Sequence, residues 1–276
     1  MRLRHIISIF ILVSILAPTT ACSQIELIEK TANQYAKLHP GLESYRVELK
    51  TNKLGEMLTR MTASMPKDMP RPETPELMKF WKRQSGTFIR STTTTAFPYM
   101  QQMINRFSQR FAIDLDTLFL PAKEADNRAK LLKIAKIKSA ESEIADNRIH
   151  HFDIEFKEPT NLDGAFYGDV LDLPQRAVKK ISLDIDPQKN ILVHIDIDSE
   201  EQGLLAVEIR HLEIDGNIMP ETVSITSPDG KIDEHLTTEF KKIENYYLPV
   251  KQVRTIRRPG LEEELIVEFS NYVLNP

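Results

Sequence analysis

Cysteine is nearly absent from this 276-residue chain, and its single copy, Cys22, excludes a disulfide within one chain. The core must therefore be held by burial of apolar side chains, which a chain of this length can supply. Glycine is scarce, at 9 residues, and the 16 prolines are scattered, which excludes a low-complexity chain. No repeat with a period of about 20 to 50 residues is present, so a solenoid is excluded as well.

The common sequence signatures of catalysis are missing too. The chain has no G-x-S-x-G nucleophile elbow, no H-E-x-x-H motif, no P-loop and no glycine-rich dinucleotide turn. An active site would have to be assembled from dispersed residues. We therefore expect a protein that is not an enzyme and that carries no cofactor.

Two short clusters combine histidine with aspartate. Side chains at i and i+2 of a strand share one face, so these clusters could supply metal ligands. The alternative is the solvated polar face of an amphipathic strand, and we favour it because the alternation itself turns these side chains outward. No metal site is predicted. The residues concerned are His150, His151, Asp153, His194, Asp196 and Asp198.

An excess of positive charge is also lacking. The chain has 36 basic and 40 acidic residues, a net charge of −4. Removing an N-terminal leader would take Arg2 and Arg4 but no acid, which leaves 34 basic and 40 acidic groups, or −6. This balance argues against a general nucleic-acid binder.

The longest apolar run stands at the N-terminus. A basic head at residues 1–5, an apolar stretch at 6–17, Pro18 and then small residues form the three regions of a secretory signal peptide. The apolar stretch is too short to span a bilayer comfortably as a mature helix. We expect residues 1–22 to be a signal peptide, and residues 23–276 to be one domain in the periplasm or anchored in the bacterial cell envelope.

Cys22 follows the small residue Ala21, where a bacterial lipoprotein carries its acylated cysteine. Thr19, however, stands where the lipoprotein pattern prefers leucine. Three alternatives stay open: Cys22 is a lipid anchor, the ordinary signal peptidase cleaves after Ala21 or slightly later, or the leader remains as an uncleaved anchor.

The C-terminal part, residues 180–274, alternates apolar and polar side chains with a period of two, which predicts five or six strands with one buried face. Turn residues such as Asp229 and Gly230 separate the runs, so consecutive strands should be antiparallel neighbours in one curled sheet. The predicted inward-facing side chains are also the candidates for lining a hydrophobic ligand site: Val193, Ile195, Leu205, Val207, Ile209, Val223, Ile225, Phe240, Leu265, Val267 and Phe269.

The first part of the chain mixes helical and strand patterns. Apolar spacing predicts a helix at 25–38, and alternation predicts strands at 45–51, 80–83, 86–90 and 151–156. Residues 57–69 are predicted as a strand or an irregular edge, and residues 122–145 as an amphipathic helix. On the helix predicted at 122–145, Leu131, Ile134 and Ala135 form an apolar side, and lysines and Arg128 occupy the rest of the surface. This basic surface is either a solvated face or a contact for anionic lipid or an acidic partner.

Another amphipathic helix is predicted at residues 100–111, before the one at residues 122–145. Its apolar residues fall at i, i+3, i+4, i+7 and i+11, which is one helical stripe. A stripe rich in methionine is usually ordinary core, but the lid of a ligand cavity would look the same. The stripe consists of Met100, Met103, Ile104, Phe107 and Phe111.

The order of these elements resembles the LolA/LolB-like periplasmic lipoprotein carriers and receptors. Residues 180–187 are similar to the family's strand that ends in an aspartate before a turn, and residues 210–222 to its next hairpin. Residues 245–249 resemble its glycine-aromatic-Leu-Pro entry to a late strand, with Asn245 in place of glycine. Residues 267–272 resemble its terminal strand. The likeness covers most of the chain after the leader as topology.

The resemblance implies an α+β fold, a half-open antiparallel β-barrel whose concave apolar face is covered by helices. It also implies outer membrane lipoprotein sorting or lipid transport, with acyl chains as ligand and a membrane protein as a further partner. The family uses a strand arginine to latch its lid, and this sequence does not assign that role among Arg46, Arg83, Arg90 and Arg210. An envelope sensor or interaction module is the alternative function.

Overall fold

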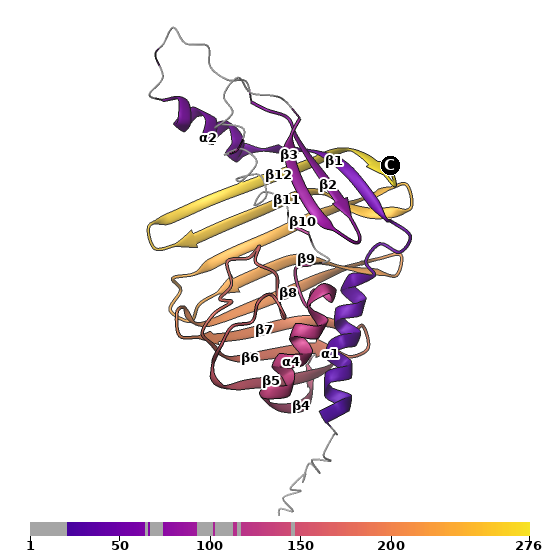
Figure 1. Cartoon of the computed structure of the whole chain (residues 1–276), viewed down its shortest axis with the longest axis vertical. Coiled ribbons are helices and arrows are strands. Elements are labelled where there is room, and N and C mark those ends of the chain that lie inside the picture. The colour runs from indigo at the N-terminus through magenta and orange to yellow at the C-terminus, as the bar shows by residue number, and fades with distance from the viewer. Residues whose placement is uncertain are drawn as a thin grey trace, which may run out of the picture.

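The computed structural model describes residues 21–63, 66, 74–92, 102, 113–114, 117–144 and 147–276. Most of the predicted signal peptide therefore lies outside the described residues. Twelve strands form one antiparallel sheet in the order β3-β2-β1-β12-β11-β10-β9-β8-β7-β6-β5-β4 (Figure 1). The strands are β1 Ser44–Thr51, β2 Leu77–Lys82, β3 Gly86–Ser91, β4 Lys136–Ile144, β5 Asn147–Thr160, β6 Val178–Asp186, β7 Ile191–Ser199, β8 Gly203–Ile214, β9 Asn217–Thr226, β10 Asp233–Ile243, β11 Tyr246–Arg258 and β12 Leu261–Leu274.

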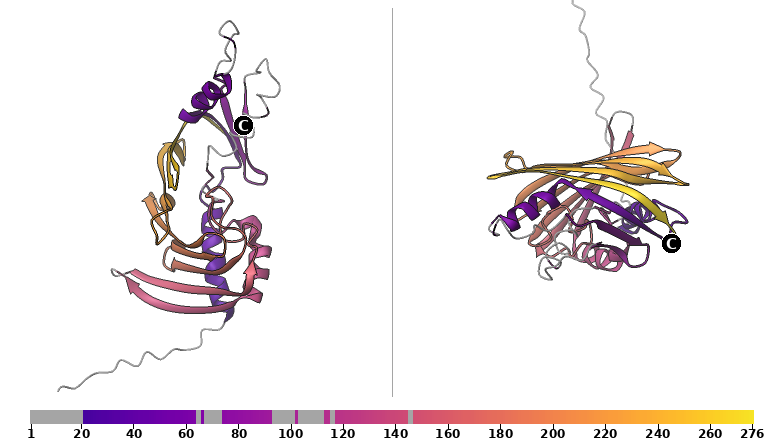
Figure 2. Two further views of the ribbon diagram at one scale, coloured as in Figure 1. Left: turned by 90° about the vertical axis from the view of Figure 1, so that its left-hand side faces the viewer. Right: turned by 90° about the horizontal axis from the view of Figure 1, so that it is seen from above.

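The sheet is a meander from β4 to β12, and β1, β2 and β3 extend it because β1 pairs with β12. The edge strands β3 and β4 do not pair with each other, so the sheet stays open. Figure 2 shows the curl, with the helices on its concave side. The predicted α+β fold with a curled, half-open antiparallel sheet is confirmed. The described region from residue 180 holds seven strands, β6 to β12, instead of five or six, because residues 246–258 form a further strand, β11, that no predicted alternating run covered.

The helices are α1 Ala21–Ala36, α2 Asn52–Thr62, the short 3-10 turn η1 Ala122–Glu124 and α4 Ala125–Ile134. Helix α1 contacts β7 and η1, and α2 contacts β12. In Figures 1 and 2, α1 and α4 lie side by side over the part of the sheet that contains β5 to β8. The predicted first helix and the strands near residues 45, 80, 86 and 151 are confirmed.

The predicted helix at 122–145 is wrong in its second half. Helix α4 ends at Ile134, Ala135 is extended, and the chain continues as β4, which pairs along its length with β5. Pairing with a neighbouring strand outweighs the helical propensity of this lysine-rich segment. Ile134, predicted for the apolar side, is 61% exposed.

The predicted strand or edge at 57–69 is also wrong where the structure describes it. Residues 52–62 form α2, and the Thr51 hydroxyl accepts a hydrogen bond from the Lys53 N–H, which caps the helix. Leu54, Leu58 and Thr62 are buried at four-residue spacing. That helical stripe begins before residue 57, where the strand was predicted to start.

Two apolar clusters occupy the concave side. The β5–β9 core follows a cross-strand row in which each residue stands opposite the next, from Phe152 through Leu183, Ile195 and Val207 to Ile225. All five are buried, and each contributes roughly 1.5–3 kcal/mol. The β1–β12 core consists of Leu42, Tyr45, Val47, Leu49, Leu54, Leu58, Leu77, Trp81, Ile89, Leu248, Val267 and Phe269.

A β-bulge changes the predicted face of Val193. The pairing of β6 with β7 shifts between Asp184 and Ile185, so that Ile185 stands opposite Leu192 and Asp184 opposite His194. The bulge leaves Val193 without a partner, and it is half-buried while Leu192 is fully buried. The inward position on this strand belongs to Leu192.

We expect Gly168→Ala to destabilise the protein by about 1–3 kcal/mol, because an added Cβ would lie 2.7 Å from the Thr117 carbonyl oxygen. Gly168 belongs to a tight crossing in which its N–H donates to the Leu118 carbonyl over 3.0 Å. Gly55→Ala is the control, since nothing lies within 4 Å of its added Cβ and α2 should gain about 0.5–1 kcal/mol. Urea unfolding of both variants measures the difference, and equal stability would contradict the prediction.

Candidate functional site

The predicted lining residues on the sheet divide between the two cores. Ile195, Leu205, Val207, Ile209, Val223 and Ile225 are buried together in the β5–β9 core, and Phe240 packs against it. Val267 and Phe269 belong to the β1–β12 core, and Leu265 packs against that one. Met100, Met103, Ile104, Phe107 and Phe111 lie outside the described residues.

The β5–β9 core is covered by helices and by two crossing loops. Phe119 bridges Tyr167, and both are fully buried with Leu118 and Phe166. The Tyr167 hydroxyl donates to the Pro174 carbonyl over 2.5 Å, which fixes the second loop. This half of the concave face is therefore filled by the protein's own side chains.

A buried polar band crosses the concave face between the two cores. Glu234 and Thr238 on β10 and Gln252 and Arg254 on β11 occupy inward positions and are each at most 8% exposed. The apolar row of the β5–β9 core ends at this band, because Ile225 stands opposite Glu234. The sequence signal of this band is the series of polar residues that continue the inward register of β10 and β11, and the predictions from the sequence did not include it.

The Gln252 side chain forms two hydrogen bonds with the backbone of Ile113. Its side-chain oxygen accepts from the Ile113 N–H over 3.0 Å, and its side-chain nitrogen donates to the Ile113 carbonyl over 2.9 Å. Both hydrogen bonds are buried. A single side chain thereby fixes the segment at Ile113 against the middle of the sheet.

Arg254 fixes a second covering segment. One guanidinium nitrogen donates to the Val170 carbonyl over 3.2 Å, and the other to Glu234 over 3.0 Å. Arg258 donates to the same glutamate over 2.7 Å. Among the described residues, Arg254 Nε and Thr238 Oγ1 are buried and have no hydrogen-bond partner, so the band keeps unused polar atoms.

Lys79 is the buried cation of the β1–β12 core. It is 1% exposed and forms an ion pair with Asp114. Its ammonium lies 5.8 Å from the ring centre of Tyr45 and 5.7 Å from that of Phe269. A cavity of about 20 Å³ adjoins it, lined by His39, Tyr45, Lys79, Trp81, Ile113, Asp114, Leu248 and Pro249.

Among the contacts of the described residues, none ties Arg46, Arg83, Arg90 or Arg210 to a segment across the concave face as a latch would. Arg83 donates to the carbonyls of Ala36 and Leu42 and so caps the end of α1. Arg46, Arg90 and Arg210 are exposed. The side chains that tie covering segments to the sheet are instead Gln252 and Arg254.

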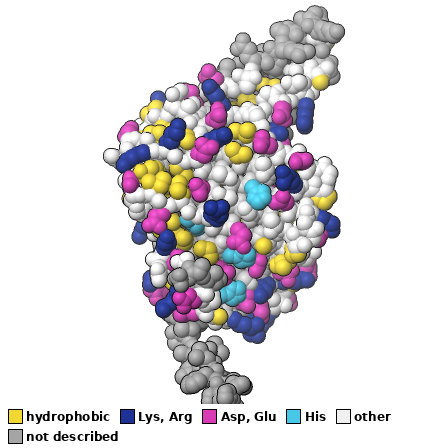
Figure 3. All heavy atoms as spheres, turned by 180° about the vertical axis from the view of Figure 1, so that it is seen from behind, with side chains coloured by type: hydrophobic (Ala, Val, Ile, Leu, Met, Phe, Trp, Pro, Cys, Tyr) yellow, Lys and Arg dark blue, Asp and Glu magenta, His cyan; other side chains and the backbone are white. Residues whose placement is uncertain are grey.

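The convex face carries the histidine clusters in cross-strand contact with acids. His151 lies 2.6 Å from Asp184, and His194 lies 2.8 Å from Glu208 and 2.9 Å from Asp196. Burial opposes protonation of His194, but its two acidic neighbours outweigh burial and raise its pKa. Figure 3 shows histidines among acidic side chains on this face. Within the described part of the chain, no histidine, cysteine and carboxylate groups have the arrangement of a metal site.

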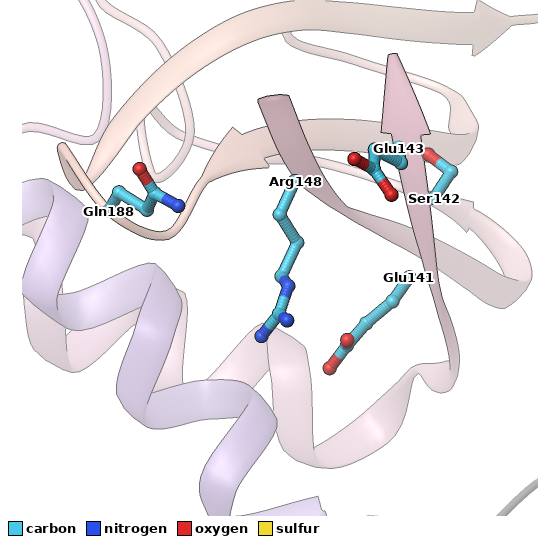
Figure 4. Close-up of a pocket in the computed structure, with 5 residues that line it drawn as sticks. All are labelled: Glu141, Ser142, Glu143, Arg148 and Gln188. Atoms are coloured by element: carbon cyan, nitrogen blue, oxygen red, sulfur yellow. The ribbon is translucent and has the colours of Figure 1, made fainter. Parts of the chain in front are cut away.

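A polar pocket opens at the end of the β4–β5 hairpin (Figure 4). It has a volume of about 390 Å³ and is lined by Glu141, Ser142, Glu143, Arg148 and Gln188. Glu141 bonds to His150 over 2.6 Å, which lowers the pKa of the carboxyl. The lining has no apolar side chain, so this pocket does not suit an acyl chain.

Among the helices that the structure describes, none has both the length and the apolar character needed to cross a membrane. No protein-family model matches the chain, and no curated protein matches its sequence.

Three solved structures resemble this chain over most of its length. A domain from Vibrio parahaemolyticus, described as an outer membrane lipoprotein-sorting protein, is 8% identical, with 93% of this chain and 94% of that one covered and a TM-score of 0.34. A LolA superfamily protein from Nitrosomonas europaea is 9% identical, covering 90% and 94%, with a TM-score of 0.33. A DUF1329 family protein from Desulfovibrio piger is 9% identical, covering 91% and 93%, with a TM-score of 0.32. At these identities and TM-scores, the likenesses assign the chain neither to a superfamily nor to an activity.

Proposed function

We propose that this chain is an exported, non-catalytic protein that binds an acyl chain or another hydrophobic moiety on its concave face. Residues 1–22 would direct export, residues 23–276 would form one binding domain, and the protein would act in the periplasm or at a membrane of the cell envelope. The ligand would be a lipid or a lipoprotein acyl chain, and its transfer between membranes would involve a membrane protein partner.

The observation that carries the proposal is how the concave face is covered. The sheet presents apolar side chains inward on both sides of the polar band, and loops and helices lie over them. The segment at Ile113 is attached to the band by the two hydrogen bonds of Gln252, and the loop at Val170 by Arg254. The net contribution of each such hydrogen bond to stability is about 0.5–1.5 kcal/mol, or up to about 3 kcal/mol when one partner is charged. Because these attachments are weak, an acyl chain can compete with the covering segments for the same apolar surface.

The proposal is tested by placing a charge on either side of one strand. We expect Leu265→Glu to weaken acyl binding by at least about tenfold, because Leu265 faces the β1–β12 core and a carboxylate there would have to be desolvated. The control is Ile266→Glu, on the same strand, equally half-buried and turned to the opposite face. Native mass spectrometry of each protein, purified from its envelope fraction, measures the retained lipid.

Stoichiometric lipid on the wild type and on Ile266→Glu, but not on Leu265→Glu, supports a binding face on the concave side. Equal retention by both variants would contradict it. A wild type with no lipid in the native spectrum, and with no affinity for added dodecanoate, would favour a sensor or interaction module. A denatured mass equal to a chain from Cys22 plus acyl groups would establish Cys22 as a lipid anchor.

A further inference from the structure

Lys79 is a buried cation of the sheet whose acid comes from outside the sheet. Arg254 pairs with Asp172 of the loop between β5 and β6, but it also pairs with Glu234 on the neighbouring strand. Lys79, on β2, pairs with Asp114, which lies outside the sheet. Among the described residues, Lys79 thus has one acid beside it, and no strand of the sheet supplies a second.

The surroundings of the Lys79 ammonium are otherwise apolar. The rings of Tyr45 and Phe269 lie under 6 Å away, and Val47 and Ile89 stand opposite Lys79 on the neighbouring strands. Trp81 stacks on Tyr45 with ring centres 5.2 Å apart. An ammonium in such a place needs an anion beside it, because these surroundings solvate it far less than bulk water does.

The cavity beside the ion pair has the size of about one water molecule at 20 Å³. Its walls are Tyr45, Trp81, Leu248 and Pro249, with His39 at the edge. Burial, together with the charge of Arg83, lowers the pKa of His39 to about 4, so this side chain adds no second cation at neutral pH. The cavity therefore has one cation, Lys79, and one anion, Asp114, in an otherwise aromatic and aliphatic setting.

The geometry points to Lys79 as the binding site for the anionic head group of the ligand, with the carboxylate of Asp114 holding that place when no ligand is bound. This inference rests on the proposed function and adds the class of ligand to it: an amphiphile with one acyl chain and a carboxylate or phosphate at its end. The chain of the ligand would lie on the apolar surface around Leu248, Val267 and Phe269.

Charge balance makes this site selective. A ligand that displaces the segment at Asp114 and has a neutral head leaves the ammonium buried and unpaired. A ligand with an anionic head replaces one carboxylate with another, and the charge stays paired. We expect an anionic amphiphile to bind at least about 100-fold more tightly than its neutral counterpart.

The test compares dodecanoate with dodecanol, which share the chain and differ in the head group. Each is titrated into the whole protein at pH 7.5 and followed by the fluorescence of Trp81, the single tryptophan of the chain and a wall of the cavity. Dodecyl phosphate is the third ligand. Tighter binding of dodecanoate than of dodecyl phosphate would identify a carboxylate as the preferred head group, and tighter binding of dodecyl phosphate would identify a phosphate. If both anions bind more tightly than dodecanol and equally well, the site accepts an anion of either kind.

Two variants separate the head-group site from general apolar binding. Asp114→Asn removes the competing carboxylate and keeps the shape of the side chain, so it should tighten dodecanoate binding by about tenfold or more and leave dodecanol unchanged. The double variant K79M/D114N has no buried unpaired charge and should fold like the wild type, but it should bind dodecanoate and dodecanol equally.

If the wild type and Asp114→Asn each bind dodecanoate and dodecanol equally well, the head-group site is wrong, although acyl binding itself is retained. A preference for dodecanoate that survives in K79M/D114N would overturn the role of Lys79. Binding of neither ligand by any of the proteins would overturn both this inference and the proposed function.

Discussion

Arg128→Met should lower the free energy of unfolding by about 3–5 kcal/mol, the largest loss expected from any single change considered for this chain. Arg128 is fully buried on α4 although it is charged. Its guanidinium donates to both carboxylate oxygens of Glu29 on α1, over 2.8 and 2.7 Å. It also donates to the carbonyls of Pro121 and Ala165, over 3.2 and 2.9 Å.

The size of the effect follows from what the arginine leaves behind. Methionine fills much of the same volume but donates no hydrogen bond, so two carbonyls and a partly buried carboxylate lose their donor together. Arg128→Lys keeps the positive charge but lacks the planar guanidinium group with its several donors. Its free energy of unfolding should therefore lie between those of the wild type and the methionine variant.

Urea unfolding followed by far-ultraviolet circular dichroism measures these differences. Lys130→Met, on an exposed position of the same helix, is the control and should change stability by less than about 0.5 kcal/mol. If Arg128→Met costs no more than Lys130→Met, the packing of α4 against α1 and the loops does not depend on the arginine.

Acid should destabilise the protein through two half-buried histidines, His39 and His211. Burial, as the largest cause, lowers the pKa of each from 6.5 to about 4. Below pH 6.5 the unfolded chain therefore binds more protons than the folded one. Stability that is complete above pH 6.5 is lost as the pH falls toward 4, by about 2 kcal/mol per histidine between pH 7.5 and 5.

The contacts of His211 explain its preference for the neutral form. Tyr35 accepts a hydrogen bond from the Leu192 N–H over 3.0 Å, so its own hydroxyl hydrogen is available for His211 Nε2, also at 3.0 Å. Protonated His211 has no lone pair to receive it. His194 acts in the opposite direction, because its pKa is raised and its protonation stabilises the folded state.

His211→Asn isolates one of the two contributions. Urea unfolding at pH 7.5 and at pH 5 should show a drop in stability that is about 2 kcal/mol smaller in this variant than in the wild type. His235→Asn, on the exposed convex face, should leave the drop unchanged. A drop of the same size in His211→Asn and the wild type would exclude His211 as a source of the acid sensitivity.

Local patterns determined the class of the fold. Strands with a clear alternation, such as residues 191–199 and 261–274, and turn residues such as Gly230 were enough to predict a curled antiparallel sheet with one apolar face. Side chains on alternate positions of a strand must point to opposite faces, whatever the rest of the chain does. The inward positions of Ile195, Val207 and Ile225 followed from this rule.

Tertiary structure decided where a local pattern suited two states. Residues 136–144 have the composition of a helix but form β4, because β5 offers a partner. Val193 lost its inward position because a bulge displaced the register by one residue. Both outcomes depend on a neighbouring strand, which a pattern within one segment does not contain.

The sequence by itself determined a core without disulfide crosslinks, a curled antiparallel sheet and the apolar face of that sheet. Only the tertiary structure decided that Glu234, Gln252 and Arg254 form a buried polar band across that face, and that Lys79 meets Asp114. Such contacts join residues from β2, β10, β11 and the covering loops, far apart in the chain. Their positions follow from how strands and loops are packed in space, so the sequence pattern of each element did not reveal them.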